Sequence, residues 1–144
     1  MPKARTPMIF TSPQDAALAF YQAFEAKDID AMMATWAEDE DIVCVHPGGP
    51  RLVGYDAVRV GWEQVFASDS RLAFRIEEIV VVETVGMALQ SALEQISVGD
   101  DPKPRGSAIA TNVFLRTPSG WRMVMHHASP AATLASAAPA GPLH

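Results

Sequence analysis

The sequence predicts an α+β domain in which a curved antiparallel sheet wraps around helices from the N-terminal half. Apolar residues recur with a helical period of about 3.6 up to residue 67, and they alternate with a period of two from Arg71 onward. With 144 residues and a 49% hydrophobic composition, the chain is large enough for one domain with a substantial core. Helices followed by long strands indicate two packed layers with a cone-shaped hollow between them.

Composition and charge narrow the classes of function. A net charge of −6 offers no basic surface to a phosphate backbone, so we expect no nucleic-acid partner. No stretch approaches the ~20 apolar residues of a membrane span, and the N-terminus lacks the apolar run of a signal peptide, which predicts a cytoplasmic protein without membrane contact. The single cysteine, Cys44, lies in an apolar run and is expected to be a buried hydrophobe rather than a reactive thiol.

Two amphipathic helices are expected after an N-terminal arm at residues 1–11. Ser12 is a good N-cap for the first, with Pro13 in the first turn and Asp15 three residues on. Asp28 caps the second, which we expect to end at Trp36. Apolar residues at helical spacing give each helix a buried face: Ala17, Phe20, Tyr21 and Phe24 in the first, and Ile29, Met32, Met33 and Trp36 in the second.

Strands follow, with one further helix among them. A short strand at 42–46 ends at His46 before a Pro-Gly-Gly-Pro break, a hairpin arm is expected at 51–54, and residues 55–67 have the period of a third helix. Alternation then predicts antiparallel strands at 72–83, 87–97, 107–116 and 121–128, joined as a meander by turn-forming segments. The domain is therefore expected to span residues 12–128, and the Ala/Pro-rich residues 129–144 to form a flexible tail.

The order of these elements and several short motifs resemble the nuclear-transport-factor-2-like superfamily. The motifs are FY (20–21), DID (28–30), WAED (36–39), VHPGG (45–49), LVGYDAV (52–58), ATNVF (110–114) and GWRMVMHHASP (120–130). They are most similar to the SnoaL-like and ketosteroid-isomerase-like branches, and the closing strand also resembles the association domain of calcium/calmodulin-dependent protein kinase II. Because this fold serves isomerases, cyclases, dehydratases, transport factors and assembly modules, the resemblance implies a fold rather than one activity.

His46 is the most informative residue for a site. An imidazole at the end of an apolar strand, just before a rigid turn, places one polar group at the mouth of the hollow. The resemblance puts His46 where the family carries its catalytic base, and histidine takes up a proton near neutral pH without a large pKa shift. The alternative is that His46 only holds its strand end to a neighbouring backbone group.

Donors for a substrate oxygen are expected on the first helix and the third long strand. The resemblance places the family's tyrosine at Phe20, next to Tyr21, and its buried acid near Thr111 or Asn112, whose amide can still donate. Strand alternation predicts that Trp121, Met123, Met125 and His127 face inward, and that Gln90, Glu94, Arg122 and His126 face outward. The predicted catalytic residues are His46, Tyr21 and Asn112, and the predicted ligand contacts are Phe20, Trp36, Trp62, Met125 and His127.

Two functions remain open on the sequence. The first is a pocket for a small apolar or carbonyl-containing molecule, with cofactor-free proton transfer from His46 as base and Tyr21, Asn112 or His127 as donor. The second is a binding or assembly module without chemistry. The resemblance also implies a homodimer through the outer sheet face. A pair of His46 and His127 would need further ligands to hold a metal, so no metal or cofactor is expected.

Overall fold

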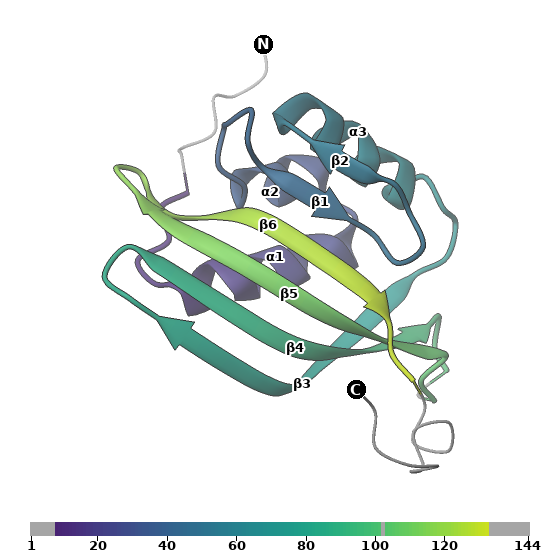
Figure 1. The fold of residues 1–144 in the computed structure, drawn as a ribbon. Helices are drawn as coiled ribbons and strands as arrows, with labels where there is room; N and C mark the ends of the chain where they lie inside the picture. The colour runs from purple at the N-terminus through teal and green to yellow at the C-terminus, as the bar shows by residue number, and fades with distance from the viewer. Residues whose placement is uncertain (1–7, 102, 133–144) are drawn as a thin grey trace.

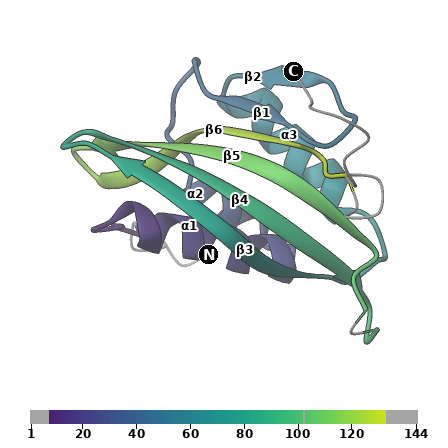
Figure 2. The same ribbon diagram turned by 60° about the horizontal axis from the view of Figure 1, so that its bottom comes forward.

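The computed structural model describes residues 8–101 and 103–132. In this part of the chain, three helices pack against one face of a curved six-stranded sheet (Figures 1 and 2). The order of elements is the predicted one. The elements are α1 (Pro13–Ala26), α2 (Ile29–Ala34), β1 (Val43–Val45), β2 (Arg51–Val53), α3 (Tyr55–Phe66), β3 (Leu72–Glu83), β4 (Met87–Val98), β5 (Gly106–Thr117) and β6 (Gly120–Pro130).

The first helix begins at the predicted cap. The Ser12 hydroxyl accepts a hydrogen bond from Asp15 N at 3.0 Å, and Pro13 occupies the first turn. Both Phe20 and Tyr21 lie on the buried face of α1, so the helix presents an aromatic ring and a phenol to the core. This geometry settles the position of Tyr21, which helical spacing alone left on the flank of the apolar stripe.

The second helix is shorter than predicted. The Asp28 carboxylate accepts from Ala31 N at 3.0 Å and starts α2, but the helix ends at Ala34 rather than at Trp36. Trp36 lies beyond the helix, where its backbone forms an isolated parallel bridge with Met123 of β6. Its side chain is nevertheless fully buried, as the apolar spacing predicts.

The sheet is mixed, which corrects the prediction of a purely antiparallel sheet. Its strand order is β2-β1-β6-β5-β4-β3, and β3 to β6 form the expected antiparallel meander. The exception is β1, which pairs in parallel with β6, so that Cys44 lies opposite His126. Figure 1 shows β1 and β2 beside β6 at one edge of the sheet and β3 at the other.

A β-bulge in β6 changes which residues of this strand face inward. Val113 of β5 pairs with Met125, whereas the next residue, Phe114, pairs with Met123. Val124 is therefore an extra residue opposite β5, and the alternation of β6 shifts by one position there. Trp121 and Met123 face the core on one side of the bulge, and His126 does so on the other.

Residues 8–10, which the sequence places in an arm, are held against the sheet. Phe10 is buried, and its carbonyl accepts from Trp121 N at 2.9 Å. Gly120 permits this contact, because it has φ +98° and a Cβ there would lie 2.8 Å from Phe10 O. At the other end β6 extends to Pro130, and residues 133–144 of the predicted tail lie outside the described residues.

Aromatic rings fill the space between the helices and the inner sheet face. Phe20 and Phe24 of α1 pack on Trp62 of α3, with ring centroids 5.5 and 4.8 Å apart. Phe24 also packs on Phe74 of β3 at 4.2 Å. These rings belong to the main hydrophobic core of the protein.

Candidate functional site

His46 directly follows β1, which ends one residue earlier than predicted, and its ring turns toward α3. The imidazole packs edge-on against Trp62, with centroids 4.5 Å apart, and its Nε2 lies 3.7 Å from Cys44 Sγ. Gly61 allows α3 to approach Leu52 of β2, since a Cβ there would lie 2.3 Å from Leu52 Cδ1. Burial lowers the pKa of His46, which keeps the imidazole neutral at pH 7.

The structure brings Tyr21 and Asn112 together inside the core. Asn112, on β5, is fully buried and donates through Nδ2 to Tyr21 Oη at 3.1 Å and to Gln90 Oε1 at 3.0 Å. Both hydrogens of the amide are therefore used within the protein. The hydroxyl hydrogen of Tyr21 is used within the protein as well, because it is donated to Glu94 Oε2 at 2.6 Å.

Glu94 faces inward, whereas strand alternation predicts that it faces outward. It lies on the inner face of β4 and is only 2% exposed. Gln90, four residues earlier on the same face of β4, is also buried. Burial raises the pKa of the Glu94 carboxyl, while the Tyr21 hydrogen bond opposes that shift. Burial and the neighbouring Glu94 also raise the pKa of Tyr21. One sequence feature indicates the inner face of β4. Ala88 and Ala92 alternate in the same set as Gln90 and Glu94, and such small residues leave room for helices to pack.

His126 faces inward and His127 outward, which reverses the prediction. His126 is 1% exposed, and its Nδ1 lies 2.6 Å from Asn112 Oδ1. Because Asn112 Oδ1 can only accept, Nδ1 carries the hydrogen and donates it. Burial is the main cause that lowers the pKa of His126 to about 3, with smaller effects from His46 and His127. The bulge at Val124 is the physical reason for the reversal, because it shifts the alternation before these residues.

These contacts form one buried polar chain, defined here as Glu94, Tyr21, Asn112, Gln90 and His126. It joins α1 to β4, β5 and β6 across the inner sheet face. Its His126 end lies 6.4 Å from His46 between ring centroids, with Trp62 5.9 Å from His126. The indole Nε1 of Trp62 is buried and has no hydrogen-bond partner in the described residues. An unpartnered donor therefore lies next to two neutral imidazoles.

The remaining predicted contacts divide between the core and the outer face. Phe20 packs 4.9 Å from the His126 ring, so it borders the polar chain. Trp36 is buried near Met123, away from that chain. Met125 was expected to face inward, but the bulge turns it to the outer face, where it lines a shallow groove with Val43 and Val113. Arg122 is buried rather than outward, and it donates to the carbonyls of Trp121 and Met8.

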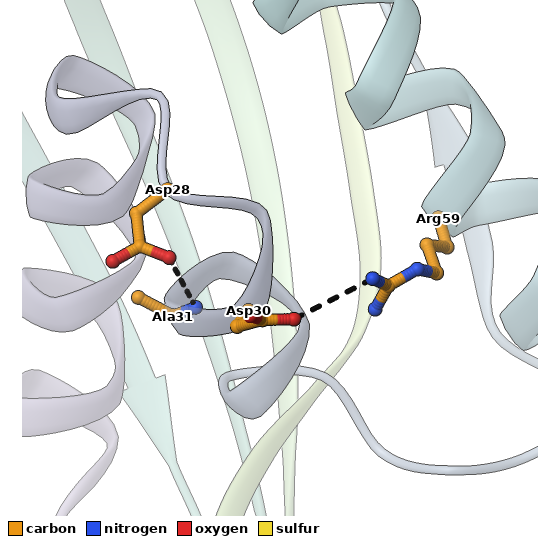
Figure 3. A network of polar contacts seen from close by, with 4 residues as sticks. All are labelled: Asp28, Asp30, Ala31 and Arg59. Carbon is orange, nitrogen blue, oxygen red and sulfur yellow. Dashed lines mark hydrogen bonds and ion pairs between the residues drawn. The ribbon is translucent and has the colours of Figure 1, made fainter. Parts of the chain in front are cut away.

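A separate cavity of about 550 Å³ lies between the three helices, outside the cone. Figure 3 shows two polar contacts at its wall: Asp28 caps Ala31 N, and Asp30 lies 3.4 Å from Arg59 Nη2. These contacts start α2 and connect it to α3. The cavity is not lined by His46, Tyr21 or Asn112, so it is distinct from the predicted site.

Residues 8–101 and 103–132 contain neither a cluster of metal-ligating side chains nor a membrane-spanning helix. No group of three or more His, Cys, Asp or Glu side chains in these ranges is placed to hold a metal ion. His46 and His127 do not form the pair considered from the sequence, since His127 faces outward. None of the helices in these ranges is long and apolar enough to cross a membrane.

An α+β cone with N-terminal helices on the concave side of its sheet is the fold of nuclear-transport-factor-2-like proteins. Within this class, the model of the SnoaL-like domain matches residues 14–133, and the chain belongs to that family.

Solved structures support this assignment. A protein from Thiobacillus denitrificans, provisionally assigned as a calcium/calmodulin-dependent protein kinase type II association domain, is 38% identical, with a TM-score of 0.83 over 87% of this chain and 99% of that one. A protein from Streptomyces avermitilis, provisionally assigned as a dehydratase of the NTF2-like family, is 34% identical, with a TM-score of 0.73 over 82% of this chain and 92% of that one.

A curated relative is larger than this chain. The F-box protein SKIP8 of Arabidopsis thaliana is 24% identical over 110 residues, which cover 76% of this chain. The match spans 46% of the length of SKIP8, so the chain corresponds to less than half of that protein.

Proposed function

We propose that this protein binds a small carbonyl-containing molecule inside the cone, beside His46, and moves a proton on it without a cofactor. The observation that carries the proposal is the buried polar chain that ends at His126, close to His46 and Trp62. Burying this many polar groups costs free energy, and such groups with shifted pKa values often mark functional sites.

His46 is the base in this proposal. Its lowered pKa leaves an unprotonated ring nitrogen at neutral pH, as proton abstraction requires. Removing a proton from the carbon next to a carbonyl turns the carbonyl into an enolate, whose oxygen needs a donor. His46 then returns the proton to another carbon, which completes an isomerisation and restores the imidazole.

The proposed donor is Trp62 rather than Tyr21 or Asn112. The hydrogens of Tyr21 and Asn112 are already used within the polar chain, so these residues act as positioning groups. The indole N–H of Trp62 has no partner in the described residues, and its ring is 4.5 Å from that of His46. Because Trp62 is fully buried, a ligand reaches it only when neighbouring side chains move apart.

Deuterium exchange tests the role of His46. A panel of cyclic ketones is incubated with the protein in D₂O, and deuterium at the carbon next to the carbonyl is measured by mass spectrometry. We expect exchange above the buffer rate, and we expect His46→Gln to lower it by about 100-fold or more, because glutamine cannot act as a base.

The chain offers a matched control for this experiment. His127→Gln makes the same substitution on the outer face and should leave the exchange rate unchanged. Equal rates for His46→Gln and the unaltered protein would remove His46 as the base.

A second candidate function is assembly through the outer sheet face. Apolar side chains that are 36 to 61% exposed lie on this face: Val80, Val82, Met87, Leu89, Ile109 and Leu115. The four long strands, β3 to β6, are spaced by about 4.8 Å and are each about 38 Å long, which gives a face on the order of 700 Å². A stable dimer buries roughly 800 Å² per partner, so this face is of suitable size for a second copy. The similarity to the Thiobacillus denitrificans protein that is provisionally assigned as an association domain also favours it.

Light scattering tests this contact. Two copies paired through this face have twice the mass of the unpaired form, which is 15.5 kDa for one chain, and Leu89→Lys should halve the measured mass by placing a charge in the apolar face. Leu18→Lys is the control, since Leu18 is exposed on α1 on the helical side. A single-chain mass for the unaltered protein at micromolar concentration would count against this assembly.

A further inference from the structure

The edge strand β3 contains a segment, residues 79–83, that is separated from the rest of the strand by a bulge. The pairing of β3 with β4 shifts between Glu77 and Val80, and Glu78 has a positive φ of 50°. Figure 1 shows β3 at the free edge of the sheet, with β4 as its only neighbouring strand in the part drawn. Among residues 8–101 and 103–132, no strand pairs with the other side of residues 79–83, which leaves it open to a further strand.

The backbone geometry of this segment shows which N–H and C=O groups point away from β4, toward the free edge of the sheet. Thr84 N donates to Met87 O at 2.7 Å, so the backbone of Thr84 faces β4. Because strand residues alternate, the backbone groups of Val80 and Val82 also face β4, and those of Ile79, Val81 and Glu83 face the free edge. Before the bulge the edge is covered, since Phe74 N donates to Glu25 Oε1 of α1 at 2.8 Å. After the bulge, no side chain in the described residues accepts from these three amides.

The side chains of the segment are apolar on both faces. Residues 79–82 are Ile-Val-Val-Val, and each is 39 to 61% exposed. Natural edge strands are usually protected by lysine, proline or a covering element, because a free edge is a template for another strand. Residues 79–83 contain neither lysine nor proline. Their composition therefore favours pairing with another strand.

The charge pattern identifies a second copy of the same segment as a suitable partner. In an antiparallel pair centred on Val81, Val81 lies opposite its counterpart, and Ile79 lies opposite Glu83 of the other copy. No carboxylate then faces another carboxylate. In a parallel pair in register, Glu83 would face Glu83, which is unfavourable. The antiparallel arrangement also gives hydrogen-bond partners to the backbone groups of Ile79, Val81 and Glu83 in each copy, with about six backbone hydrogen bonds in total.

We propose that residues 79–83 pair antiparallel with the same residues of a second copy, which joins two sheets into one continuous sheet. This contact uses the backbone edge of β3, and it is distinct from assembly through the outer sheet face. It does not depend on the proposed chemistry at His46.

Amide hydrogen exchange, followed by NMR at low and high protein concentration, tests the pairing directly. We expect the Val81 amide to exchange more slowly at high concentration, because it becomes hydrogen-bonded across the edge. Val82 is the internal control, since its amide faces β4 and should be protected at both concentrations. A Val81 amide that exchanges as an unprotected amide at every concentration would overturn the proposal.

Two variants at one position keep the test independent of folding defects. Val81→Pro removes the edge N–H without removing a hydrogen bond to β4, and Val81→Lys places like charges opposite each other across the edge. Each should halve the mass measured by light scattering at high concentration, while the urea midpoint confirms that the variant is folded. If both variants fold and keep the mass of the unaltered protein, edge pairing is excluded. The Leu89→Lys variant tests assembly through the outer sheet face separately.

Discussion

Glu94 is a carboxyl group in a place where the core would normally accept an apolar side chain. Glu94 is only 2% exposed, and its carboxyl group accepts a hydrogen bond from the Tyr21 hydroxyl. Tyr21 in turn accepts from Asn112, which accepts from His126, so one buried acid is connected to a buried imidazole through two neutral groups. Such a chain stabilises the core only while all its members are hydrogen-bonded, which makes each member sensitive to substitution.

The first prediction concerns the pH dependence of stability at Glu94. Burial raises the folded-state pKa of this carboxyl above its ordinary value of 4.5. The folded protein therefore holds the proton more tightly than the unfolded chain, and stability falls as pH rises from 4.5 through the raised pKa. Glu94→Gln keeps an acceptor for Tyr21 but cannot ionise. We expect it to lose less stability than the unaltered protein as the pH rises above 4.5, measured by urea unfolding.

The control is Glu63→Gln, which makes the same change at an exposed position on α3 and should keep the pH dependence of the unaltered protein. A Glu94→Gln variant with an undiminished loss of stability would mean that Glu94 is ionised in the folded state without penalty.

The site was partly predictable from single residues. His46, Tyr21 and Asn112 could be selected because a polar residue in an apolar stretch is visible in the sequence. Glu94 and His126 were visible too, but they were assigned to the outer face. The direction of a strand residue depends on the layer that covers the strand, and sequence alternation gives two faces without saying which one the helices cover.

At the scale of elements, local signals defined most of the fold. The cap at Ser12 and the turns between β3, β4, β5 and β6 depend on neighbouring residues, and these elements lie within a few residues of their predicted ranges. Two features depend on distant segments and were not predicted. They are the bulge at Val124, which reverses His126 and His127, and the parallel pairing of β1 with β6.

The turn between β5 and β6 carries a prediction of its own. Gly120→Ala should destabilise the protein by about 1–3 kcal/mol, because alanine is strained at φ +98° and its Cβ would meet Phe10 O at 2.8 Å. Urea unfolding followed by tryptophan fluorescence measures the change. Gly86→Ala is the matched control, since a Cβ at Gly86 meets nothing within 4 Å. Equal effects of the two substitutions would show that the Phe10 contact does not stabilise the turn.

At the scale of the whole molecule, the same strands contribute side chains to both the inner and the outer face of the sheet. Gln90 and Glu94 belong to the polar chain, while Leu89 on the same strand is exposed on the other face. The hydrogen bonds of the buried polar chain lie within a single copy of the protein. We therefore expect Leu89→Lys to retain ketone deuterium exchange at the rate of the unaltered protein even when its outer face is unpaired. A loss of exchange together with the loss of mass would mean that assembly completes the site.

The central claim is that a carbonyl ligand binds between His46 and Trp62, and the indole N–H signals of ¹⁵N-labelled protein test it most directly. Trp36 and Trp62 are both buried and both lack a partner for Nε1 in the described residues, but only Trp62 lies beside His46. When a cyclic ketone that shows exchange is titrated in, we expect the Trp62 indole signal to move downfield as it donates to the carbonyl, while that of Trp36 stays in place. A stationary Trp62 signal at saturating ketone, or a shift confined to Trp36, would contradict the proposed site.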